Sequence, residues 1–219
     1  MTNSLTTGVE LCTLDPVTGQ VTVLGTLPPA DGDLGGLAWW APDELYAGNR
    51  TGDIVDIHLG AVTGAIVANE GGHIGGLERW GTELLGIDQT MHDIVQFVPP
   101  AGSFVRTPLT SGGSALVSSG GDLVQMSNGD WLLWPNVQGE LFRLDPTTGV
   151  ATALGPAATV PSISGLVRDD QDHLYGIMAS TDQVVDIDPA SGAVGATRTM
   201  CVSCPTPYDF VSGDLTRTP

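Results

Sequence analysis

The chain has 219 residues, a formal net charge of −18 at pH 7, and seven basic residues, all of them arginine. This charge argues against nucleic acid as a partner, because phosphates attract Lys and Arg, and against docking on anionic lipid. Cations, basic partners and neutral ligands such as sugars remain open. The 30 glycines and 15 prolines follow no collagen period and are typical of many short strands joined by turns.

Several features bear on the cellular location. No run of about 18 apolar residues is present, so we expect no membrane span. The opening MTNSLTTGVE has neither the basic nor the apolar region of a signal peptide. The glycine-rich composition without lysine nevertheless favours an extracellular or cell-surface bacterial protein whose signal has been removed, with an intracellular protein as the alternative. A halophilic origin is a further, weaker interpretation of the charge.

Taken in chain order, the sequence predicts strands almost throughout and shows no helical period. Residues 1–8 are expected to be loose, and the first hairpin joins strands at 9–14 and 20–24. Four units of four strands follow, with a longer loop at 108–118. A last apolar segment at 208–215 resembles the first strand of a unit. The expected strands of the four units are 35–40, 44–48, 52–58 and 65–68; 75–80, 83–87, 93–98 and 103–107; 120–126, 131–134, 140–144 and 150–154; and 164–169, 173–177, 183–187 and 193–199.

One strand–turn–strand pattern recurs along the chain. Its turns, such as LDPTTG at 144–149, combine a proline that fixes φ, an Asp that bonds back to the turn and a closing Gly. The residues that open the five copies are separated by 43, 40, 47 and 43 positions, and a period in this range indicates a repeat architecture. The five residues are Leu14, Ile57, Phe97, Leu144 and Ile187.

These repeats predict a single all-β domain over residues 1–219, a β-propeller of about five four-stranded blades. The repeats run roughly over 9–33, 34–72, 73–118, 119–161 and 162–205, and 206–219 completes the first. The chain opens with the outer strands of a blade and closes with an inner one. We therefore expect the termini to pair in one shared blade, which hides edge strands. A truncated propeller of six or seven blades is the alternative.

The strand and turn motifs also resemble a known group. LYAG at 45–48, LYGI at 174–177, LDPTTG at 144–149 and IDPASG at 187–192 look like bacterial β-propellers with NHL-like or YVTN-like repeats. The resemblance covers nearly the whole chain and implies the propeller fold. It leaves the function open, because this group includes lactonases, lyases, lectin-like modules and protein-binding scaffolds.

Candidate ligand-binding residues lie in the loops that lead from the fourth strand to the next blade and from the second strand to the third. Both loop types share one end of a propeller, and equivalent places in successive blades converge on the axis. Three residues occupy equivalent places, four before a leucine: Asp33, His73 and Ser162. The full candidate set is Asp33, Asn49, Arg50, His73, Asp88, His92, Asn136, Ser162 and Asp182.

Two groups of side chains raise the question of a metal. Imidazoles and carboxylates in the second unit could hold Zn²⁺ or a similar divalent ion, or they are scattered polar loop residues. These are Glu70, His73, Asp88 and His92. The acidic run at 169–172 lacks the glycine and distal glutamate of a calcium loop and is expected to be a polar turn. The five tryptophans predict packing between blades, with one or two able to stack on a sugar.

The sequence shows no nucleophile–base set and no compact metal motif, so no catalytic residue is predicted. It favours a non-catalytic ligand- or protein-binding module with a protein or carbohydrate partner and no cofactor beyond the divalent metal considered above. The alternative is a metal-assisted hydrolase or lyase with its site at the channel mouth. Of the three cysteines, Cys201 and Cys204 are expected to form a local disulfide; a bridge from Cys12, a zinc site and fully reduced thiols are the competing interpretations.

Overall fold

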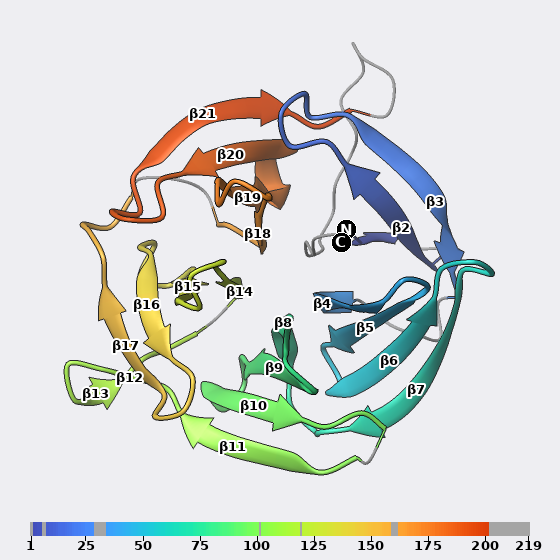
Figure 1. Ribbon diagram of the computed structural model, residues 1–219, viewed down its shortest axis with the longest axis horizontal. Coiled ribbons are helices and arrows are strands. Elements are labelled where there is room, and N and C mark those ends of the chain that lie inside the picture. The colour runs from blue at the N-terminus through green and yellow to red at the C-terminus, as the bar shows by residue number, and fades with distance from the viewer. Residues whose placement is uncertain are drawn as a thin grey trace.

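The computed structural model describes residues 2–5, 8–28, 34–100, 102–118, 120–158 and 162–201. Small antiparallel sheets stand around a common axis, each with its first strand near the centre and its last at the circumference (Figure 1). The protein is therefore an all-β propeller, as the repeats predict. In the described part of the chain, no helix has the length and hydropathy that crossing a membrane requires.

Four sheets have the four-strand order of a propeller blade, and we number them I to IV. Blade I comprises β4 (Leu34–Ala41), β5 (Glu44–Asn49), β6 (Asp53–His58) and β7 (Thr63–Asn69). Blade II comprises β8 (Ile74–Trp80), β9 (Glu83–Asp88), β10 (Asp93–Phe97) and β11 (Phe104–Pro108). Blade III comprises β14 (Gly121–Gln125), β15 (Trp131–Pro135), β16 (Phe142–Asp145) and β17 (Val150–Ala153). Blade IV comprises β18 (Gly165–Arg168), β19 (Leu174–Met178), β20 (Gln183–Ile187) and β21 (Val194–Thr199), with the short 3₁₀ helix η2 (Ala179–Thr181) before β20.

The prediction of about five four-stranded blades is corrected to four. The remaining sheet has three strands, β1 (Thr2–Leu5), β2 (Gly8–Leu14) and β3 (Val21–Leu27). The expectation that residues 1–8 are loose is wrong for β1, which pairs with β2 from Thr2 opposite Leu11 to Leu5 opposite Gly8. The segment expected to supply the innermost strand, 208–215, lies outside the described residues. Pairing of the two termini in one blade thus stays a prediction.

The DP-x-[TS]-G turns join β2 to β3, β16 to β17 and β20 to β21, and we call them Asp-Pro turns. In each, the Asp carboxylate accepts a hydrogen bond from the backbone N–H two residues on, at 2.9, 3.0 and 3.0 Å. It also accepts one from the hydroxyl three residues on, at 2.7, 2.7 and 2.5 Å. The hydroxyl bond is the main cause of a lowered pKa at each of the three carboxyls, those of Asp15, Asp145 and Asp188.

The Asp-Pro turns also connect neighbouring sheets. Gly149 accepts a backbone hydrogen bond from Thr110 at 2.9 Å, and Gly19 accepts one from Cys201 at 3.0 Å. A Cβ on Gly149 would lie 2.1 Å from the Pro108 carbonyl oxygen, so this close approach needs glycine. Cys201, the last described residue, meets the turn at Gly19 in a similar backbone contact and forms an isolated parallel bridge with Gln20 rather than a strand of a shared sheet.

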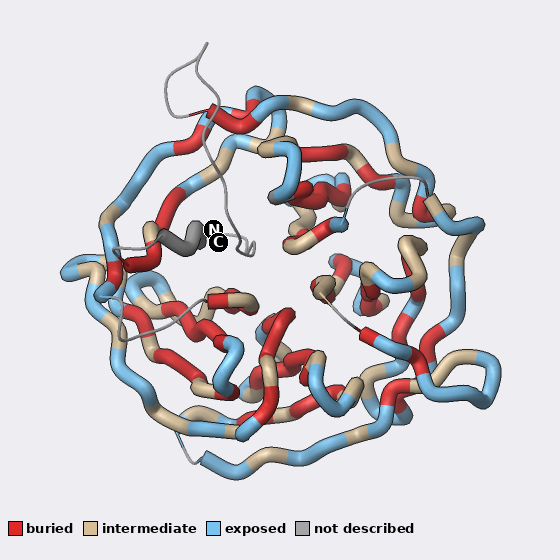
Figure 2. The backbone as a smooth tube through the Cα atoms, turned by 180° about the vertical axis from the view of Figure 1, so that it is seen from behind, coloured by how far each residue is buried: buried red, intermediate tan, exposed pale blue. Residues whose placement is uncertain are grey.

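The segment 108–118, expected to be a loop, contains a small hairpin of β12 (Thr110–Ser111) and β13 (Ser114–Ala115). β12 pairs in parallel with β17 and widens blade III at its outer edge. The apolar core lies between blades; one cluster joins Trp134 of blade III to Leu174 and Val185 of blade IV. Buried positions follow the inner and middle strands, while most positions along the outer strands are exposed or intermediate (Figure 2).

Candidate functional site

Two of the residues predicted to bind ligand at the channel mouth hold turns together. Asn49 and Asp88 end β5 and β9 at equivalent places and are buried, with exposed fractions of 2% and 0%. Asn49 Oδ1 accepts hydrogen bonds from the N–H groups of Thr51 and Asp53 at 2.9 and 2.8 Å. Asp88 Oδ1 accepts one from the Thr90 N–H at 2.7 Å. Both side chains thus satisfy the backbone of the turn that follows them.

The carboxylates of the predicted metal set do come together, but around a guanidinium. Arg106 on β11 pairs with Asp88 Oδ2 at 2.7 Å and with the buried Glu70, and lies 3.6 Å from Asp93 Oδ2. The two buried carboxylates therefore share one guanidinium of the chain itself. This pairing was not predicted, because Arg106 lies on the outer strand and reaches Asp88 only through the folded register.

The two histidines of that set make other contacts. The backbone N–H of His73 donates to Thr90 Oγ1 at 3.1 Å, and the imidazole Nδ1 of His92 lies 3.3 Å from the Ser118 carbonyl oxygen. Over the described residues, no group of three or more His, Cys, Asp or Glu side chains is arranged to hold a metal ion. The described geometry gives the four-residue metal set no support.

The remaining candidate ligand-binding residues lie in different parts of the chain. Asn136 Oδ1 accepts the Ile163 N–H at 2.8 Å and so ties blade III to the approach to blade IV. Arg50 and Ser162 are exposed, and Asp33 lies outside the described residues. His92 and Asp182 adopt positive φ angles of 61° and 52°. They occupy the turn position that Gly52 and Gly139 fill in the other blades. What the four residues share at this position is the positive φ angle that the turn requires.

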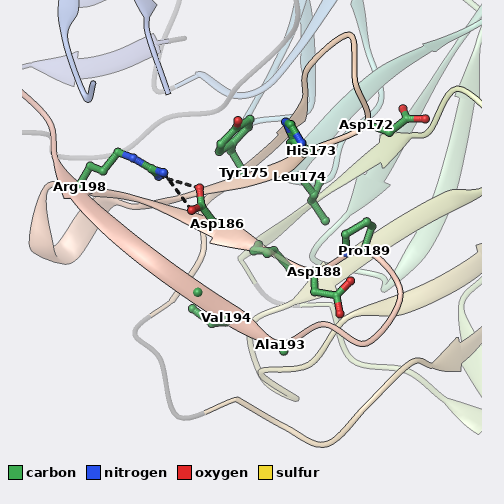
Figure 3. A pocket seen from close by; sticks show the side chains of 12 residues that line it. Asp172, His173, Leu174, Tyr175, Asp186, Asp188, Pro189, Ala193, Val194 and Arg198 are labelled. Carbon is green, nitrogen blue, oxygen red and sulfur yellow. Dashed lines mark hydrogen bonds and ion pairs between the residues drawn. The ribbon is translucent and has the colours of Figure 1, made fainter. Parts of the chain in front are cut away.

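A cavity of about 680 Å³ lies at the opposite end of the propeller, in blade IV. Its lining comes from the start of β19, the end of β20 and the start of β21, together with the turns beside them (Figure 3). We call it the blade IV pocket. Its lining contains carboxylates, one guanidinium and one phenol beside apolar side chains such as Pro189 and Val194. Sequence reasoning missed it because it interpreted LYGI and IDPASG as strand and turn signals only.

The charges in the blade IV pocket do not balance. Arg198 makes two parallel hydrogen bonds to Asp186, at 2.6 and 2.9 Å (Figure 3). These bonds are the main cause of the raised pKa of Arg198. Hydrogen bonds from Ser127 and Ser191 lower the pKa values of Asp172 and Asp188 respectively. Asp172 also lies 3.2 Å from Arg168, which is outside the pocket lining. Asp188 is therefore the acidic residue of the lining that has no ion pair among the described residues.

The acidic turn at 169–172 lies beside the pocket and contributes Asp172 to its lining. Asp169 Oδ1 accepts the N–H groups of Gln171 and His173 at 2.8 and 3.0 Å. Its Oδ2 lies 2.8 Å from His173 Nδ1 and accepts the Tyr175 hydroxyl at 3.3 Å. Burial is the first cause of the raised pKa of Tyr175, which stays a neutral donor at pH 7. This segment is the expected polar turn, since its carboxylate is used by the chain.

Tryptophans and cysteines complete the predicted set. Trp131 and Trp134 are buried, and Trp80 meets Trp131 edge-on with ring centroids 6.2 Å apart, as expected for packing between blades.

Cys201 is disulfide-bonded, whereas Cys12 is a buried thiol, so the predicted alternative of a bridge from Cys12 is wrong. Cys204 lies outside the described residues, and its pairing with Cys201 stays a prediction.

No protein-family model and no curated protein sequence matches the chain. Solved structures do resemble it. A Bacteroides thetaiotaomicron protein of unknown function has 13% identity and a TM-score of 0.62 over 88% of this chain and 55% of its own. Virginiamycin B lyase from Staphylococcus aureus has 15% identity and a TM-score of 0.56 over 92% of this chain and 64% of its own. The chain thus spans less than two thirds of either protein.

A third similar structure has about the same length as the chain. A chain of the nidogen/laminin complex has 14% identity and a TM-score of 0.60 over 90% of this chain and 92% of its own. Likenesses at such low identity show the fold and not the activity. They agree with the resemblance found in the turn and strand motifs: the chain is a β-propeller similar to the bacterial NHL-like and YVTN-like group.

Proposed function

We propose that the chain is a non-catalytic binding module whose blade IV pocket receives a positively charged segment of a partner protein. The observation that carries the proposal is the negative charge of this pocket: Asp186 pairs with Arg198 and Asp172 lies 3.2 Å from Arg168, whereas Asp188 has no ion pair among the described residues. The net charge of −18 acts in the same direction, because it attracts cations toward every face of the molecule.

The form of the pocket supports a side chain as occupant. Its volume of about 680 Å³ falls within the range of small-ligand sites. An incoming Arg could pair with Asp188 through its planar fork and lay its alkyl stem along Pro189 and Val194. The nidogen/laminin complex supplies a propeller of similar length in a protein–protein assembly. The disulfide at Cys201 supports an oxidising location such as the cell exterior.

Binding of a fluorescein-labelled hexa-arginine peptide, measured by fluorescence anisotropy, tests the proposal. We expect saturable binding that weakens with added salt. Asp188→Asn should weaken it about fivefold, which corresponds to about 1 kcal/mol for one exposed charge, because the amide oxygen can keep the turn bonds. Glu83→Gln, an equal change of charge at the start of β9 in blade II, should have a much smaller effect.

Arg198→Gln separates the ligand classes. It removes the one guanidinium of the pocket lining, so it should strengthen binding of the cationic peptide. Absence of peptide binding, or weaker binding after Arg198→Gln, would contradict the proposal. Binding on a glycan array without peptide binding would move the module to the carbohydrate-binding class. A stoichiometric metal in purified protein, lost with His73→Ala and His92→Ala, would favour the hydrolase or lyase alternative.

A further inference from the structure

A second cavity, of about 430 Å³, lies in blade III at the place equivalent to the blade IV pocket. The strand registers establish the equivalence. Trp131 pairs with Leu144 in blade III as Leu174 pairs with Ile187 in blade IV. The residues that follow, Asp145-Pro146 and Asp188-Pro189, open the two Asp-Pro turns and line the two cavities. We call the second cavity the blade III pocket.

The blade III pocket repeats the charge pattern in a weaker form. Arg143 lies 3.5 Å from Asp130 Oδ2, and both side chains are substantially exposed. The Thr148 hydroxyl is the first cause of the lowered pKa of Asp145. Two carboxylates therefore line this pocket with one guanidinium, against three with one in blade IV. Each pocket keeps an excess of negative charge.

The two pockets lie on neighbouring blades and at the same end of the propeller. Asp172, which lines the blade IV pocket, accepts the backbone N–H of Ser127 at 3.1 Å, and Ser127 lies in the turn that leads to β15 of blade III. The feature does not continue into blades I and II. There the register places His58 and Val98 where blades III and IV have the Asp of the Asp-Pro turn.

We propose that the two pockets act together as one bivalent site for a linear segment that carries two groups of cationic side chains. The inference rests on the function proposed above and adds a second contact on blade III. Once one group occupies the blade IV pocket, the other meets the blade III pocket at an effective concentration in the millimolar range. Two weak electrostatic contacts then give an affinity that neither reaches alone.

Peptides with one or two arginine pairs test this arrangement. The monovalent probe is a labelled peptide with a single Arg-Arg pair; the bivalent probe joins two such pairs by Gly-Ser linkers of increasing length. We expect the bivalent probe to bind at least about tenfold more tightly at its best linker length, with weaker binding for shorter and longer linkers.

Variants locate the second contact. Asp145→Asn should remove most of the bivalent advantage and leave monovalent binding through blade IV nearly unchanged. The retained monovalent binding also shows that the variant is folded. Glu83→Gln should preserve the bivalent advantage.

Equal affinity of the two probes, or a bivalent advantage that survives Asp145→Asn, would overturn the inference and leave the proposed function standing. If neither probe binds and hexa-arginine also fails, the proposed function itself is overturned. A strict preference for an uncharged glycan over both probes would overturn the choice of a cationic ligand.

Discussion

Asp122 is the side chain whose replacement tests the packing of the inner strands most sharply. It lies on β14, is 1% exposed, and accepts the Leu123 N–H at 2.7 Å. Its second oxygen accepts the Leu166 N–H of β18 at 2.6 Å, so one carboxylate crosses from blade III to blade IV. A Cβ on Gly76 of blade II would lie 2.6 Å from Asp122 Oδ1, so blade II approaches from the other side.

The expected change in the free energy of unfolding follows from these two hydrogen bonds. In Asp122→Asn the amide keeps one acceptor oxygen and turns an NH₂ group toward the other backbone N–H. A buried donor left without an acceptor costs about 1–3 kcal/mol, and bonds to charged acceptors lie in the upper part of that range. We therefore expect Asp122→Asn to lower the free energy of unfolding by about 2 kcal/mol, or the midpoint of thermal unfolding by roughly 4–8 °C for a chain of this size. Asp122→Ala, which removes both bonds, should cost more.

Guanidinium chloride unfolding followed by circular dichroism measures the effect. The control is Asp130→Asn, which removes an exposed carboxylate 3.5 Å from Arg143. It should change the free energy of unfolding by less than about 1 kcal/mol, as exposed ion pairs do. If Asp122→Asn unfolds within about 0.5 kcal/mol of the wild type, the carboxylate does not couple the inner strands, and the reasoning is refuted.

Three further predictions concern pH, the cysteines and closure of the ring. Burial raises the pKa of Asp56, whose buried Oδ1 has no hydrogen-bond partner, so its ionised form costs stability at pH 7. Asp56→Asn should raise the denaturation midpoint at pH 7, and this gain should shrink as the pH falls through the raised pKa and wild-type Asp56 takes up its proton; a pH-independent gain would contradict this cause. Non-reducing peptide mapping should find Cys201 linked to Cys204 and a thiol at Cys12, and three thiols under oxidising conditions would contradict it. Deletion of 208–219 should lower the melting temperature of the whole domain, whereas unchanged melting would remove the closure model.

The sequence predicted most of the strands because each blade strand is a short apolar run bounded by turn residues. The run QVVDI gave 183–187, which is the observed extent of β20. The hairpin β12–β13 was missed because its residues, Thr110–Ser111 and Ser114–Ala115, carry no strand pattern. Its pairing with β17 is a tertiary contact, which local preference does not encode. The blade number was overestimated because five turns repeat, while over the described residues three sheets have four strands, blade III has six and the remaining sheet has three.

The site was harder to predict than the fold. The acidic and histidine residues in the loops of blade II suggested that Glu70 and Asp88 lie close together. The spacing of these residues in the sequence did not indicate that Arg106 would lie between the two carboxylates. The blade IV pocket depends on the shift in register between Val185 and Ile187 on β20 and on the pairing of Arg198 with Asp186. Both are properties of the folded sheet, so a search for loop residues at the channel mouth could not find this pocket.

Chemical-shift mapping by ¹H–¹⁵N NMR, with the hexa-arginine peptide titrated into labelled protein, locates the binding site directly. We expect shifts concentrated at the blade IV pocket, from His173 to Tyr175 and from Asp188 to Gly195, with a weaker set around Asp145. Shifts concentrated instead at the opposite end, around Arg50, His92 and Asp182, would contradict this expectation and return the binding site to the channel mouth.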